Sequence, residues 1–141
     1  MYVTLARALV GASSAIPLVI GLIHLAYTFR GPKLTPRDVE VQQSMSVATP
    51  VLTRETTMWK AWIGFNASHA LGIILFGILY GYLVLVQPAF FFRSTFLMAL
   101  GFAVLASYLV LAKLYWFSVP LRLIAVALVA YAAGVIVAVC A

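Results

Sequence analysis

Residues 58–86, MWKAWIGFNASHALGIILFGILYGYLVLV, form an apolar run with a single charged side chain, Lys60. A helix needs about 20 consecutive apolar residues to cross a hydrocarbon core of roughly 30 Å at 1.5 Å per residue. Residues 5–29, 92–116 and 120–140 meet the same requirement. The sequence therefore predicts an all-α integral membrane protein, with residues 1–141 folded as one antiparallel bundle of four transmembrane helices.

The composition of the whole chain supports this class. Of the 141 residues, 65% are apolar and 9% are charged, and the mean hydropathy is +1.12. Soluble domains are about half apolar and about a quarter charged, so a soluble fold of this size has no interior for the excess. The net charge of +6 does not indicate nucleic-acid binding, because the basic residues are scattered along the chain. The single cysteine, Cys140, excludes an intrachain disulfide.

One polar segment, residues 30–57, interrupts the apolar runs and holds all three acidic residues: Asp38, Glu40 and Glu55. Within it, residues 35–38 resemble a helix-capping box with proline at the first helical position, which predicts a short interfacial helix. The alternation of Val39 and Val41 leaves a short strand open instead. The other connections, residues 87–89 and 117–119, are short enough to make their flanking helices antiparallel neighbours.

The basic residues predict an orientation for the four spans. Two of the nine, Arg7 and Arg93, lie on the side of the termini, and the remaining seven lie on the side of the polar segment. Basic residues in short loops favour the cytoplasmic side. We therefore expect loop 30–57 in the cytoplasm and both termini outside, with aromatic anchors such as Trp59 and Trp116 near the span ends.

Small residues at four-residue spacing predict close helix packing, because helices in lipid approach each other through small side chains. These rows are Gly64/Ser68/Gly72, Ala99/Ala103/Ser107, Ala130/Gly134/Ala138 and the pair Gly77/Gly81. In the first span, the helical period separates a small and polar face from an apolar one. Ser13, Ser14, Pro17, Gly21, His24 and Thr28 form the face expected to turn inward. Leu18, Leu22, Leu25 and Phe29 form the face expected to meet lipid.

Two histidines are candidates for a binding site inside the spans. In the second span, His69 shares one helical face with Trp62 and Asn66, as do Trp59, Ile73, Phe76 and Tyr80. His69 lies about 13 Å below the loop-side interface, and His24 lies about 9 Å below it. The similar depths predict that both imidazoles lie in one interior region with Asn66 within hydrogen-bonding reach.

The chemistry of such a cluster has several interpretations. Neutral histidine and asparagine are ordinary hydrogen-bonding partners between membrane helices. Alternatively, His24, His69, Asn66 and Trp62 form a cofactor-binding pocket for a haem held by two imidazoles, a quinone or a lipid headgroup. No metal site is predicted, because Glu55 lies about 20 Å along the helix from His69.

The positions of the acidic residues argue against several classes of protein. None of the predicted spans contains Asp or Glu, whereas proton-coupled transporters rely on a buried carboxylate. A Ser-His-Asp arrangement cannot be assembled inside the spans for the same reason, so no catalytic residue is predicted.

Residues 56–69, TTMWKAWIGFNASH, with GLIH at 21–24 and YWFS at 115–118, resemble a family of small, uncharacterised bacterial inner-membrane proteins with four transmembrane helices. The resemblance covers most of the chain and implies a bacterial inner-membrane protein. The resemblance implies no particular activity and no functional residues. The expected function is that of a non-catalytic accessory or assembly subunit of a larger membrane complex, in contact with lipids and other membrane subunits. The alternative is a small redox or ligand-binding membrane protein that uses the histidine pocket.

Overall fold

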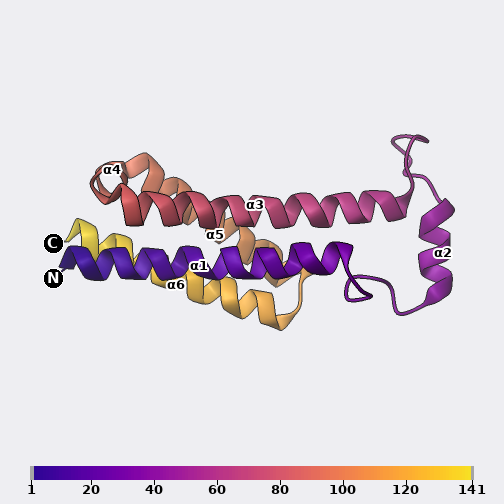
Figure 1. Cartoon of the computed structure of the whole chain (residues 1–141), viewed down its shortest axis with the longest axis horizontal. Helices are drawn as coiled ribbons and strands as arrows, with labels where there is room; N and C mark the ends of the chain where they lie inside the picture. The colour runs from indigo at the N-terminus through magenta and orange to yellow at the C-terminus, as the bar shows by residue number, and fades with distance from the viewer. Residues whose placement is uncertain (1, 141) are drawn as a thin grey trace. The chain divides into compact units, whose positions relative to one another are not determined.

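All of the regular structure in the computed structural model, which describes residues 2–140, is helical (Figure 1). The helices are α1 (Tyr2–Phe29), α2 (Val39–Val47), α3 (Met58–Val86), α4 (Pro88–Arg93), α5 (Thr95–Tyr115) and α6 (Ser118–Val139). No strand occurs within residues 2–140. The predicted all-α class is confirmed.

Four of these helices are long and apolar enough to cross a membrane. They are α1, α3, α5 and α6, with 28, 29, 21 and 22 residues. A helix of 21 residues is about 32 Å long, which matches a hydrocarbon core. These four helices correspond to the four apolar stretches of the sequence.

Local capping sets helix ends that hydropathy alone places incorrectly. The third long helix begins at Thr95 rather than at residue 92, because the Ser94 hydroxyl accepts a hydrogen bond from the Leu97 amide at 3.2 Å. Residues 88–93 form the separate short helix α4, with Pro88 at its first position. The fourth long helix begins at Ser118 instead of residue 120.

The predicted short helix is present as α2, and the alternative strand is not formed. The predicted cap was wrong, however. Asp38 caps the helix by accepting a hydrogen bond from the Glu40 amide at 2.9 Å. The Thr35 hydroxyl instead donates to the Pro32 carbonyl at 2.9 Å, within the turn that precedes the helix.

Contacts divide the described chain into two units, residues 2–20 with 73–140 and residues 21–72. The first unit has its core around Tyr80 and Tyr131, both almost fully buried. Their hydroxyls donate to backbone carbonyls of the first turn of α5: Tyr80 to Leu97 and Tyr131 to Met98, each at 3.0 Å. These bonds satisfy two phenol groups that burial would otherwise penalise.

Three glycines provide the closest helix contacts of this first unit. A Cβ atom at Gly77 would lie 2.6 Å from Leu18 Cβ and 2.8 Å from the Ser14 carbonyl oxygen. A Cβ at Gly134 would lie 2.7 Å from Val10 Cγ2, and one at Gly101 would overlap the Tyr131 hydroxyl. Close approach of helix backbones through glycine is the packing mode expected for apolar helices.

The predicted packing rows are therefore only partly correct. Gly77 and Gly134 are buried in helix contacts, as predicted for the Gly77/Gly81 pair and the Ala130/Gly134/Ala138 row. The other two rows were wrong, since Gly64, Ser68, Gly72, Ala99, Ala103 and Ser107 are all exposed. The bulky residues Phe76 and Tyr80 determine the buried face of the later part of α3.

The polar face of α1 is buried as predicted. Ser13, Ser14, Pro17, Gly21 and Thr28 are all buried, and His24 is half-buried. The hydroxyls of Ser13 and Ser14 both donate to the Val10 carbonyl at 2.9 Å, so the helix itself satisfies them. Leu22 and Phe29 are exposed as predicted, whereas Leu25 is half-buried and so is Leu18, which packs against Gly77.

The second unit contains the end of α1, the polar segment with α2, and the start of α3. The chain leaves α1 through Gly31, whose φ of +79° favours glycine. Two hydrogen bonds hold the segment to the start of α3: Met58 N–H to the Ala48 carbonyl at 2.8 Å, and the Trp62 indole N–H to the Leu34 carbonyl at 2.9 Å.

Candidate functional site

His24, Asn66 and His69 meet within the second unit. The Nε2 atom of His24 lies 3.1 Å from Asn66 Oδ1, and the ring centroids of His24 and His69 are 5.3 Å apart in an edge-to-face arrangement. The three side chains are half-buried. The predicted proximity of the two imidazoles and the amide is therefore present. Helical phase produces it, because Asn66 and His69 are one turn apart on the same face of α3.

The hydrogen bonds show which atoms of this cluster donate and which accept. The Asn66 Nδ2 group donates to the Trp62 carbonyl at 2.8 Å, which leaves Oδ1 as the acceptor. Nε2 of His24 therefore donates to Asn66 Oδ1. The Thr28 hydroxyl forms another hydrogen bond beside the cluster, because it donates to the His24 carbonyl of the same helix at 2.9 Å.

Trp62 contributes to the arrangement through its backbone and its loop contact. Its carbonyl receives the Asn66 amide, and its indole N–H is bonded to Leu34. The side chain is 42% exposed. Trp62 thus joins α3 to the loop that follows α1, while its place in a cofactor site stays a prediction.

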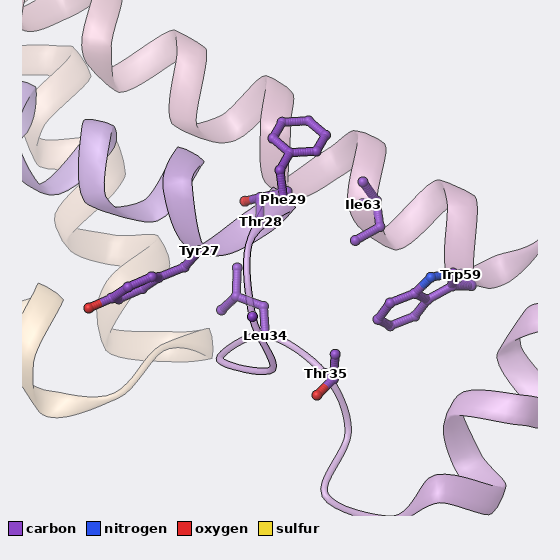
Figure 2. A pocket seen from close by; sticks show the side chains of 8 residues that line it. Tyr27, Thr28, Phe29, Leu34, Thr35, Trp59 and Ile63 are labelled. Atoms are coloured by element: carbon purple, nitrogen blue, oxygen red, sulfur yellow. The ribbon is translucent and has the colours of Figure 1, made fainter.

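A pocket of about 320 Å³ lies in the same unit, at the loop ends of α1 and α3 (Figure 2). It is lined by Tyr27, Thr28, Phe29, Gly31, Leu34, Thr35, Trp59 and Ile63. Figure 2 shows the indole of Trp59 reaching from α3 toward the loop residues Leu34 and Thr35, with Ile63 one turn further along the same helix. None of the four predicted site residues is among the lining residues.

The sequence did not predict this pocket, because part of its lining (Gly31, Leu34 and Thr35) comes from an irregular loop. Leu34 and Thr35 have no periodicity that would place them against α3. The available signal is Gly31 directly after the helix, since glycine there commonly reverses the chain. Thr28 lines the pocket and also bonds His24, so the pocket and the histidine cluster are joined through one residue.

The geometry bears on haem, one of the alternatives that the sequence left open. Ligation by two imidazoles places the iron between them, and the porphyrin plane then separates the rings. In the structure the two rings are in edge contact, and Nε2 of His24 is engaged by Asn66. A haem between His24 and His69 does not fit this arrangement. A quinone carbonyl or a lipid headgroup needs only a hydrogen-bonding group at the edge of the cluster.

Comparison with known protein families, with curated proteins and with solved structures finds no match to this chain.

Proposed function

We propose that the chain is a non-catalytic, multi-pass protein of the bacterial inner membrane that serves as an accessory or assembly subunit of a larger membrane complex. In this proposal α1, α3, α5 and α6 cross the bilayer as one antiparallel four-helix bundle. Their lengths and their apolar composition support insertion. The short connections through α4 and through residues 116–117 support antiparallel neighbours.

The observation that carries the accessory role is the exposed face of α3. Gly64, Ser68 and Gly72 form a row of small residues at four-residue spacing, and all three are exposed. Nothing lies within 4 Å of a Cβ built on Gly64. Rows of this kind admit the close approach of another membrane helix. Because the three residues are exposed, we infer that a helix from another subunit packs on this row.

The test of this role is purification from native membranes in a mild detergent. A subunit of a larger complex retains a different membrane protein through purification, and the exposed row of α3 is where the contact is expected. A bulky substitution within this row is expected to reduce that retention.

The proposed orientation places loop 30–57 in the cytoplasm and both termini outside. Ser44 lies exposed on α2, so a Ser44→Cys variant in a Cys140→Ser background is expected to resist a membrane-impermeant maleimide in intact cells. The native Cys140 is also exposed and is the matched control, because it is expected to react from outside. Rapid labelling at position 44 together with protection at position 140 would reverse the orientation.

The contact of His24, Asn66 and His69 favours a second candidate function, the binding of a quinone headgroup. The second N–H of the Asn66 Nδ2 group can donate to a quinone carbonyl, and the apolar composition of the long helices suits an isoprenoid tail. Protein purified from native membranes is then expected to yield quinone on solvent extraction, and an Asn66→Leu variant to yield much less. Exposed Ser107 on α5 supplies the control variant, Ser107→Leu. Equal quinone content in both variants would eliminate this candidate.

A further inference from the structure

The pocket between the end of α1 and the start of α3 has a mostly apolar lining with few groups to hold a polar ligand. Tyr27, Phe29, Leu34, Trp59 and Ile63 contribute most of its side chains. Two threonines also line it, but both hydroxyls already donate to backbone carbonyls, Thr28 to His24 and Thr35 to Pro32. The Tyr27 hydroxyl and the Trp59 indole N–H are the other polar side-chain groups of the lining, and any charged partner for a polar head must come from outside it.

The surroundings of the pocket are basic. Residues 27–37, six of which line the pocket, contain Arg30, Lys33 and Arg37 and no acidic residue. On α3, Lys60 follows the lining residue Trp59. All four basic residues are exposed. The nearest acid in sequence, Asp38, is occupied in capping α2. The segments that line the pocket thus combine a mostly apolar lining with four exposed basic residues, each within two positions of a lining residue in the sequence.

From this combination we propose that the pocket holds one anionic phospholipid from the leaflet on the loop side. Its phosphate groups contact Arg30 and Lys33, and its glycerol and upper acyl chain pack against Trp59 and Ile63. The pocket lies where two apolar helices end beside a tryptophan, which is the depth of the headgroup region. A basic residue near a membrane surface contributes about 1 kcal/mol of attraction to anionic lipid.

The proposal rests on the membrane insertion proposed above, but it does not depend on the accessory role. It concerns a site distinct from the histidine cluster. Zwitterionic phosphatidylcholine carries the same phosphate, but its choline cation offsets the charge. The pocket is therefore expected to prefer phosphatidylglycerol over phosphatidylcholine.

Native mass spectrometry of the full chain in a nonionic detergent measures this preference directly, with phosphatidylglycerol and phosphatidylcholine as probes. The wild type is expected to retain one phosphatidylglycerol molecule and to lose phosphatidylcholine. Each basic residue removed is expected to weaken binding about fivefold, so Arg30→Gln/Lys33→Gln weakens it about 25-fold. Arg93→Gln/Lys113→Gln removes the same charge from exposed positions elsewhere and is expected to leave binding unchanged.

A second pair of variants tests the pocket itself. Ile63→Trp fills the space and is expected to abolish retention of phosphatidylglycerol. Leu75→Trp adds the same bulk at an exposed position of α3 and is expected to have no effect. Millimolar inorganic phosphate is not expected to displace the lipid, because the acyl chain contributes to binding.

Three results would overturn the proposal: equal retention of the two lipids, equal losses in the two double-charge variants, or displacement by phosphate alone. The failure of membrane insertion gives a different signature, since alkaline carbonate would then extract the native protein from membranes.

Discussion

Replacing Gly77 by alanine is expected to destabilise the protein, whereas the same change at Gly64, on the same helix, is not. The new methyl group at position 77 would meet Leu18 Cβ at 2.6 Å, the Ser14 carbonyl oxygen at 2.8 Å and the Leu18 amide nitrogen at 2.9 Å. Two of these atoms belong to the backbone of α1, so relief requires the helices to separate. Overfilling a packed site typically costs about 1–3 kcal/mol.

At Gly64 no atom lies within 4 Å of the added methyl group, and alanine is a better helix former than glycine by up to about 1 kcal/mol. The Gly64→Ala variant is therefore expected to melt at or slightly above the temperature of the wild type. Melting in detergent, followed by tryptophan fluorescence, measures both variants under identical conditions. Equal melting temperatures for Gly77→Ala and Gly64→Ala would show that α1 and α3 are not in contact through Gly77.

This pair of glycines also shows how far helix packing could be predicted from the sequence. Both lie in rows of small residues at the same spacing, and the pattern does not distinguish a row that packs inside the chain from one on its surface. The difference comes from neighbours on α3. Phe76 and Tyr80 need burial and a hydroxyl partner, and they turn the face with Gly77 toward the core. The exposed row of Gly64, Ser68 and Gly72 lies on the opposite side.

Hydropathy predicted the four long helices because their apolar composition is continuous, but it did not predict the caps that set the starts of α5 and of the short helix α2. The Ser94 hydroxyl begins α5 and the Asp38 carboxylate begins α2, and either cap depends on the local path of the backbone. Helical periodicity was sufficient to predict that His24 lies near His69 and Asn66. His24 on α1 and the other two residues on α3 lie on regular helices at similar depth. It was not sufficient for the pocket, where Leu34 and Thr35 come from a loop that turns at Gly31.

If the protein is an accessory subunit, substitutions in the exposed small-residue row on α3 are expected to cause the largest loss of partner association. Ser68 lies in the middle of that row, and its hydroxyl donates only to the Phe65 carbonyl of its own helix at 3.0 Å. A Ser68→Leu variant is therefore expected to fold normally while it blocks the approach of a partner helix. A steric cost of about 1–3 kcal/mol corresponds to a loss of association of at least about fivefold.

Co-purification of the variants from native membranes tests the accessory role most directly. The matched control is Val126→Leu, which enlarges an exposed side chain of α6, a helix whose small-residue row is already engaged in packing through Gly134. In mild detergent, the wild type and Val126→Leu are expected to retain the same partner membrane protein, and Ser68→Leu is expected to lose most of it. Retention of no other protein by the wild type, or equal retention by Ser68→Leu and Val126→Leu, would contradict the account.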